Sequence, residues 1–331
     1  MEDVIHAARF AAPDEAYLEA VARRRALSLS GEKLVAPDEL WLPASENCNF
    51  RCVGCWREGM FKKSYLSLDE TRRILENNKG HRFKSVSLTS GEGFLHPLLC
   101  DIIELCRETY PDAYIDMMSN GSIPPRGRFA EAVAMIDDLG LSIDGCTKET
   151  FENIRVGGNF ERFVENARAV VEIRKETGNP RDLTFCFTAM TTNIAELPGV
   201  VDLAADIGVP MVYAQPMEVD APDIFERIGA YHLTNMPLSE IYAISEDALA
   251  RGKARGVTVD LAGILRPPKP GEKADALDPD QVIDADEIAR DIRHCQYPYT
   301  EAFQYLRSGD RFRVLPCCYM SEGVADTMAE R

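Results

Sequence analysis

Residues 46–58, Glu-Asn-Cys-Asn-Phe-Arg-Cys-Val-Gly-Cys-Trp-Arg-Glu, are the stretch around which the predicted fold is organised. They place Cys48, Cys52 and Cys55 at Cys-x3-Cys-x2-Cys spacing, directly after the apolar run of residues 40–42. Three thiolates on one loop can hold three irons of a four-iron cluster, whereas complete cysteine ligation needs a fourth cysteine. Such a site keeps one coordination position open, and open positions are where metal centres carry out chemistry.

The composition indicates a soluble protein with a large core. The chain has 331 residues, 45% of them hydrophobic, which is enough for one large α/β domain with an appended region. Its net charge of −17 disfavours nucleic acid as a partner, because phosphate binding requires clustered Lys and Arg. The sequence has neither a long apolar run nor a secretory signal. We therefore predict a cytoplasmic protein with no membrane partner.

Short apolar runs alternate with amphipathic helices after the cysteine loop. A capping box, Ser67-Leu-Asp-Glu, opens the first of these helices. Parallel strands need helical crossovers, so the alternation predicts an α/β fold with a parallel sheet. Six units are too few for a closed eight-fold barrel, and we expect a six-stranded (βα)6 partial TIM barrel. The expected strands are residues 39–43, 86–88, 113–117, 139–143, 183–188 and 210–214.

Polar and glycine-rich residues follow these strands one after another. They include the cysteine loop, residues 90–93, residues 119–120, Asp144, Asn193 and Gln215. In barrels and open α/β sheets, functional residues gather at the carboxyl ends of the strands. The pattern therefore predicts an active site at that end of the sheet.

Three regions follow from this division. Residues 1–38 are expected to form an N-terminal helical extension, and residues 39–216 the βα core. Residues 217–331 are expected to form a C-terminal region with a helix, an acidic loop at 266–286 and a hairpin. The cysteines of this last region, Cys295, Cys317 and Cys318, flank the expected hairpin.

The motifs of the core resemble those of the radical S-adenosylmethionine (SAM) enzymes. Cys-x3-Cys-x2-Cys after the first strand of a βα array is one match. Thr89-Ser-Gly-Glu-Gly resembles the Gly-Gly-Glu-Pro turn of that family, with Ser90 and Gly93 as departures. Leu141-Ser-Ile-Asp-Gly, followed by Glu149, Phe151 and Ile154-Arg155, resembles a run found in the subgroup that carries extra clusters. The resemblance covers residues 39–216.

The resemblance implies a cofactor set and a chemistry. Cys48, Cys52 and Cys55 would bind a 4Fe-4S cluster, and the amino and carboxylate groups of SAM would chelate the open iron. A flavodoxin or ferredoxin would supply the electron that cleaves SAM to a 5′-deoxyadenosyl radical, which abstracts hydrogen from the substrate. The protein would orient the reactants and exclude water.

The same resemblance implies the SAM contacts. The turn at Ser90, Gly91 and Glu92 would meet the methionine amino group. Arg155 would reach the SAM carboxylate, Ser142 or Asp144 would lie near the ribose, and Asn120 and Asn193 would add further contacts. The backbone of residues 214–215 would lie near the adenine. The family often has a larger residue where this chain has Gly54, just before the third cysteine.

The C-terminal cysteines resemble the opening of the auxiliary-cluster domains called SPASM and twitch, in an abbreviated form. Cys295, Cys317 and Cys318 can hold a second iron–sulfur cluster, or Cys317 or Cys318 can donate hydrogen to a substrate radical, or all three can be packed thiols. Cys146 and Cys186 are further donor candidates, because each lies near the end of a strand. A donor thiol favours epimerisation, whereas an auxiliary cluster favours dehydrogenation; decarboxylation is a third outcome.

The substrate class is the least constrained expectation. Residues 1–38 are too few for the leader-binding module that relatives acting on ribosomal peptides often carry. We therefore expect a small polar metabolite of natural-product biosynthesis, such as a sugar, an aminoglycoside or a nucleoside-type intermediate. Modification of a ribosomal peptide is the alternative. A non-enzymatic zinc-binding protein and an electron carrier are hypotheses from other classes.

Overall fold

The computed structural model describes residues 39–55, 65–89, 91–217 and 228–267, together with the backbone of residues 302–308 and 311–315. The predicted extension at 1–38 and most of the acidic loop lie outside these residues. Ser90, Cys295, Cys317 and Cys318 lie outside them as well, so their predicted roles stay predictions.

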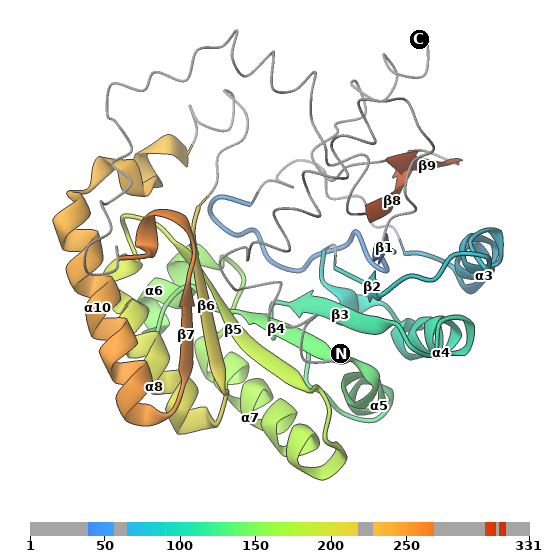
Figure 1. The fold of residues 1–331 in the computed structure, drawn as a ribbon, viewed down its shortest axis with the longest axis horizontal. Coiled ribbons are helices and arrows are strands. Elements are labelled where there is room, and N and C mark those ends of the chain that lie inside the picture. Colours follow the sequence, from blue (N-terminus) through green and yellow to red (C-terminus); the bar gives the residue numbers. More distant parts are fainter. Residues whose placement is uncertain are drawn as a thin grey trace, which may run out of the picture.

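A parallel sheet forms the centre of the molecule (Figure 1). Seven strands follow one another along it, each parallel to the next. They are β1 (Glu39–Trp41), β2 (Ser85–Ser87), β3 (Tyr114–Ser119), β4 (Asp138–Ser142), β5 (Asp182–Ala189), β6 (Met211–Pro216) and β7 (Thr258–Leu261). The α/β class and the parallel sheet predicted from the sequence are thus confirmed.

The predicted count of six strands is wrong, because β7 continues the parallel series beside β6. The long interval between β6 and β7 interrupts the regular spacing of strands and helices, which is why the expected barrel ended at β6, although the sequence also predicts a strand at residues 257–261. Two further strands extend the opposite edge. β8 (Ala302–Ser308) pairs in parallel with β1, and β9 (Arg311–Leu315) pairs antiparallel with β8. The sheet is open, with β7 and β9 at its two edges.

Helices cover one face of this sheet (Figure 1). They are α3 (Leu68–Asn77), α4 (Leu99–Thr109), α5 (Arg128–Met135), α6 (Lys148–Ile154), α7 (Phe160–Thr177), α8 (Leu197–Ile207) and α10 (Leu238–Arg255). The predicted capping box is present at α3: Glu70 donates its backbone N–H to Ser67 Oγ, and its carboxylate accepts the Ser67 N–H. Among the described residues, no helix combines the length and the apolar character that crossing a membrane requires.

Strand alternation separates the two faces of the sheet. On β5, Phe185 points to the helices, where its ring centroid lies 5.7 Å from that of Phe163 in α7. Cys186 points the other way, and its sulfur lies 3.8 Å from Met118 Sδ on β3. We call this second face, which the helices of the described residues do not cover, the inner face. The carboxyl ends of β1 to β6 meet at one rim of it, and the cysteine loop follows β1 at that rim.

Candidate active site

The cysteine loop is tied to the turn that follows β2. Gly91 donates its N–H to Ser45 O at 2.8 Å, and Glu92 donates to Asn47 O at 2.8 Å. This approach requires glycine at position 91, since a Cβ there would lie 2.3 Å from Asn47 O. The predicted turn and the predicted loop are therefore in direct backbone contact.

The other side of the loop is tied to the end of α6. Arg51 donates its N–H to Val156 O, and Val53 donates to Ile154 O, both at 2.8 Å. Gly157, at φ +96°, follows this segment, and a Cβ there would lie 3.1 Å from Asn49 O. The cysteine loop is thus held between segments that follow β2 and β4, which fixes where its thiols lie.

The three thiols of the loop are free and half-buried. Burial raises the pKa of Cys48, and burial raises the pKa of Cys52 to about 11, with the nearby Arg155 guanidinium opposing the shift. Without a bound cation the thiols of Cys48 and Cys52 stay protonated at neutral pH. Metal binding reverses this, because a coordinating thiol is deprotonated outright.

The arrangement of donors distinguishes a cluster from a single ion. In the part of the chain that the structure describes, no three His, Cys, Asp or Glu side chains are grouped as ligands of one metal ion. Ligands of one zinc ion must converge on a point, whereas a four-iron cluster takes each thiolate to a different iron. Three free thiols on one tied loop match in number the three protein ligands of a four-iron cluster with one open iron.

Glu92 lies beneath this loop with its carboxylate turned into the protein. The residue is fully buried, and its oxygens accept from Phe94 N at 3.1 Å, Ser119 Oγ at 2.9 Å and Asn120 N at 2.6 Å. Burial raises the pKa of this carboxyl, and these donors oppose the shift. A carboxylate engaged in this way connects the turn after β2 to the end of β3.

Asn120, at the end of β3, connects that strand to the cysteine loop. Its Nδ2 donates to Asn49 Oδ1 at 2.9 Å and lies 3.8 Å from Cys48 Sγ. Its Oδ1 accepts from Ser122 N at 2.9 Å, which fixes the orientation of the amide. The structure thus brings the predicted residue Asn120 together with the first cysteine.

Arg155 and Asp144 form a buried ion pair beside the second cysteine. Arg155 Nη2 lies 2.7 Å from Asp144 Oδ2, and Arg155 Nη1 lies 3.9 Å from Cys52 Sγ. The other carboxylate oxygen, Asp144 Oδ1, accepts from Thr188 N at 2.8 Å. Burial raises the pKa of the Asp144 carboxyl, and the guanidinium beside it acts in the opposite direction.

One atom of this pair lacks a partner. Arg155 Nε is buried and has no hydrogen-bond partner among the described residues. Buried donors are nearly always satisfied, and an exception calls for a bound group or water. An unsatisfied donor beside the cysteine loop therefore fits the binding of an anionic or sulfur-rich group.

Asn193 is hydrogen-bonded to the backbone, whereas Ser142 lies on the inner face of the sheet. The Asn193 amide donates to Asp144 O at 3.0 Å and Thr188 O at 2.9 Å, and it accepts from Met190 N at 2.7 Å. It therefore joins the ends of β4 and β5, with its polar atoms engaged by the backbone. Ser142 is the last residue of β4 and is half-buried on the inner face.

The two candidate donor thiols of the core lie on different sides of the sheet. Cys146 packs against the helix layer, where a Cβ on Gly199 of α8 would lie 2.5 Å from its sulfur. The structure does not bring Cys146 together with the cysteine loop. Cys186 lies on the inner face, opposite Ser142 in the register of β4 and β5. Burial raises the pKa of Cys186 to about 12, which keeps the S–H bond that a hydrogen-atom donor needs.

Met217 is a residue that the sequence pattern did not single out. It follows β6, is 2% exposed, and packs in a small cluster with Ile154, Met190 and Ile228. A Cβ on Gly54 would lie 2.8 Å from Met217 Sδ. In the sequence, a methionine after a strand is indistinguishable from an ordinary core residue. Only the glycine at position 54 indicated that a side chain packs closely against the loop there.

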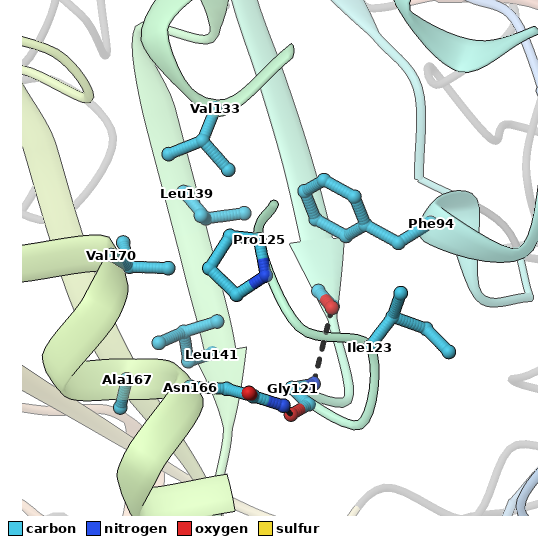
Figure 2. A pocket seen from close by; sticks show the side chains of 11 residues that line it. Phe94, Gly121, Ile123, Pro125, Val133, Leu139, Leu141, Asn166, Ala167 and Val170 are labelled. Carbon is cyan, nitrogen blue, oxygen red and sulfur yellow. Dashed lines mark hydrogen bonds between the residues drawn. The ribbon is translucent and has the colours of Figure 1, made fainter. Parts of the chain in front are cut away.

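A small cavity lies on the helix side of the sheet, between β3, β4, α5 and α7 (Figure 2). Figure 2 shows Asn166 directed at Gly121, where its Nδ2 donates to Gly121 O at 2.8 Å. Most of the lining is apolar, so the cavity belongs to the core. Its lining residues are Phe94, Ser119, Gly121, Ile123, Pro125, Val133, Leu139, Leu141, Asn166, Ala167 and Val170.

The chain is similar in sequence to a known family and to several curated proteins. Residues 42–204 match the family model of the Radical SAM superfamily. A probable GTP 3′,8-cyclase of Methanococcus maripaludis is 25% identical over 211 residues, which cover 62% of this chain and 66% of that protein. The GTP 3′,8-cyclase of Petrotoga mobilis is 26% identical over 209 residues, which cover 62% of each chain. The match thus spans slightly less than two thirds of these relatives.

Solved structures share the fold. Streptococcus suis SuiB superposes with a TM-score of 0.60 at 16% identity, over 93% of this chain and 67% of that one. The enzyme anSMEcpe with bound AdoMet superposes with a TM-score of 0.51 at 16% identity, over 68% of this chain and 61% of that one. The family match over residues 42–204, the relatives and this fold therefore agree on the radical SAM superfamily, a class defined by a 4Fe-4S cluster and SAM.

Proposed function

We propose that Cys48, Cys52 and Cys55 are the ligands of the 4Fe-4S cluster and leave one iron open for SAM. The observation that carries this proposal is the way the loop is held, with backbone hydrogen bonds to the turn after β2 and to the end of α6. When bound, the cluster supplies the electron that cleaves SAM, and hydrogen abstraction from the substrate follows.

The proposed SAM contacts of the other residues follow from how their polar groups are hydrogen-bonded within the protein. Arg155, with its unsatisfied Nε, binds the SAM carboxylate, and Asp144 orients that guanidinium. Gly91 keeps the turn, which also contains Ser90, close to the loop. Glu92 and Asn193 act indirectly, since their polar side-chain atoms are engaged within the protein. Ser142 faces the ribose.

We also propose that the substrate is a small polar metabolite. Along β4 to β7 the inner face presents polar side chains at neighbouring register positions, with Ser142 opposite Cys186 and Tyr213 opposite both Cys186 and Asp260. A polar surface of this kind favours a ligand with hydroxyl or amino groups, because such groups can hydrogen-bond to it.

Charge narrows this class further. Asp116, Asp138 and Asp182 lie side by side across β3, β4 and β5, and no inner-face position of β1 to β7 is Lys or Arg. Asp138 and Asp182 open β4 and β5, at the end of the sheet away from the cysteine loop, so the preference comes from the net charge of −17, which favours a neutral or amine-bearing substrate over a polyanion. A sugar, an aminoglycoside or a nucleoside fits it. GTP, which the names of the curated relatives carry, is disfavoured by its phosphates.

A peptide is the competing substrate. SuiB has been solved with its precursor peptide SuiA, but at 15% identity that likeness concerns the fold. Epimerisation, dehydrogenation and decarboxylation all start from the same hydrogen abstraction. The choice among them depends on Cys186 and on Cys295, Cys317 and Cys318, the last three outside the described residues.

The test is substrate-stimulated SAM cleavage. Reconstituted protein is incubated anaerobically with dithionite, SAM and one candidate at a time, and 5′-deoxyadenosine is quantified. We expect an aminoglycoside, amino sugar or nucleoside to raise its release above the basal rate. Stimulation by GTP alone, or by a ribosomal precursor peptide alone, would overturn the proposed substrate class. Absence of any cleavage would overturn the proposed site.

A further inference from the structure

The three cysteines of the loop have different neighbours. Cys52 Sγ lies 3.9 Å from the cationic Nη1 of Arg155, and Cys48 Sγ lies 3.8 Å from the neutral amide Nδ2 of Asn120. The cation is buried, since the Arg155 side chain is 12% exposed and that of its partner Asp144 is 4% exposed. One sulfur of the loop therefore has a desolvated positive charge against it.

Asp144 fixes this charge in place. One of its carboxylate oxygens pairs with Arg155 Nη2 at 2.7 Å, and the other accepts from Thr188 N at 2.8 Å. Asn193 donates to Asp144 O at 3.0 Å and so holds the backbone beneath the pair. Asp144 follows β4 and is hydrogen-bonded to β5, so the ion pair is fixed relative to the sheet. This holds the Arg155 guanidinium next to the Cys52 sulfur.

A fixed charge beside a cluster ligand has a definite electrostatic effect. Reduction adds one negative charge to an iron–sulfur cluster, and a nearby cation stabilises the reduced form more than the oxidised form. Hydrogen bonds to ligand sulfurs, net charge and solvent exposure are the factors that set cluster potentials. Burial strengthens the effect, because little water screens the charge.

We propose that Arg155, held by Asp144, raises the potential at which the cluster accepts its electron by placing its guanidinium against the Cys52 sulfur. This rests on the proposed ligand role of Cys52. It is separate from the binding of the SAM carboxylate, since Nη1 faces the sulfur while Nε is the unsatisfied atom. Arg155 is in this respect a tuning residue whose effect is present without SAM.

The chain offers a matched control at the other end of the same strand. Arg107 of α4 pairs with the buried Asp137, which immediately precedes β4, whereas Asp144 follows β4. Residues 137 and 144 are separated by roughly 23 Å if the strand rise applies throughout. Replacing Arg107 therefore removes the same charge from a comparable pair, beyond the range of strong interaction with the loop.

The experiment is an anaerobic redox titration of the reconstituted protein, followed by electron paramagnetic resonance, without SAM and without substrate. R155Q is expected to lower the midpoint potential, R155K to lower it less, and R107Q to leave it unchanged. D144N removes the counter-charge while Arg155 keeps its own, so its potential is expected to rise. Shifts of opposite sign for R155Q and D144N would identify charge as the cause.

Each outcome separates the two proposals. Iron and sulfide analysis of the wild type comes first, and absence of a cluster would overturn the ligand assignment itself. With a cluster present, an unchanged potential in R155Q, or an equal fall in R107Q, would overturn the tuning role. If R155Q assembles no cluster, the midpoint potential of D144N is the deciding measurement. An unchanged or lower potential in D144N would overturn the proposal.

Discussion

Met217 packs directly against the backbone of Gly54: a Cβ on Gly54 would lie 2.8 Å from Met217 Sδ, and Gly54 itself is at φ +78°. The third cysteine follows Gly54 directly, so the end of β6 determines how closely this part of the loop can approach the sheet. Backbone conformation and side-chain packing thus both require glycine just before Cys55.

Substitution of Gly54 should destabilise the loop. G54A places a side chain in the left-handed region, which costs about 1–2 kcal/mol, and it adds the contact with Met217. We expect a lower midpoint in urea unfolding and a lower iron content after reconstitution. The double variant G54A/M217A should recover iron binding in part, because it relieves the contact and leaves the backbone strain.

Gly80 supplies the control for this measurement. A Cβ on Gly80 would meet nothing within 4 Å. G80A should therefore change the free energy of unfolding by less than about 0.5 kcal/mol. If G54A behaved like G80A in both stability and iron content, the packing described for the loop would be wrong.

Glu92 should prove to be a structural carboxylate. E92Q keeps one acceptor oxygen but turns an NH2 group toward donors such as Asn120 N and Ser119 Oγ. A buried polar group without a partner costs about 1–3 kcal/mol. We expect a loss of this size in the free energy of unfolding, measured on the cluster-free protein. E70Q, at the exposed capping box of α3, should stay close to wild type, and equal losses in both variants would contradict this role.

His96 should make stability depend on pH. Burial lowers its pKa from the ordinary value of 6.5, and its Nδ1 accepts from Leu98 N, so the neutral ring is the folded form. A lowered histidine pKa gives stability that is complete above the unfolded value and is lost as pH falls through the folded value. The wild-type melting temperature should therefore drop below about pH 6.5.

The contribution of this one histidine appears as a difference between two proteins. In H96Q the titrating group is absent, so the part of the pH dependence due to His96 should disappear. Thermal unfolding at a series of pH values from neutral to acid measures it in both proteins. Parallel curves for wild type and H96Q would show that His96 is not the group responsible.

Cys186 is the candidate donor thiol that lies on the inner face of the sheet, and we propose that it donates hydrogen to a substrate radical. If it does so, C186A should still release 5′-deoxyadenosine while product formation falls at least about tenfold, which is about 1.4 kcal/mol of lost transition-state stabilisation. Product formed by the wild type in D2O should carry one solvent deuterium. C146A should retain wild-type turnover, because its thiol packs against α8. Undiminished product from C186A would exclude this role.

Local sequence patterns were sufficient for much of the fold. Short apolar runs and the capping box at Ser67 are short-range signals, and the structure has strands and a helix at these places. The seventh strand, at residues 258–261, was not counted with the six of the expected barrel because the segment before it breaks the regular spacing of strands and helices. The register in which two strands pair depends on residues far apart in the chain, so no local sequence pattern predicts it.

The site was predictable at the level of which segments meet. The cysteine loop, the turn at Gly91 and the segment at Arg155 are in backbone contact or side-chain contact, as strand ends of one sheet should be. How each side chain is engaged was not predictable. The partners of Glu92 are near the end of the next strand, and those of Asn193 follow two different strands. The packing of Met217 against Gly54 depends on residues far apart in the chain.

The central claim is that the loop of Cys48, Cys52 and Cys55 holds the cluster that cleaves SAM. Its most direct test compares wild type with the C48A/C52A/C55A variant after anaerobic reconstitution, by iron content and by 5′-deoxyadenosine released with dithionite and SAM. The triple variant should hold about four irons fewer per chain and release no 5′-deoxyadenosine. Equal iron contents in the two proteins, or stoichiometric zinc without iron in the wild type, would contradict the claim.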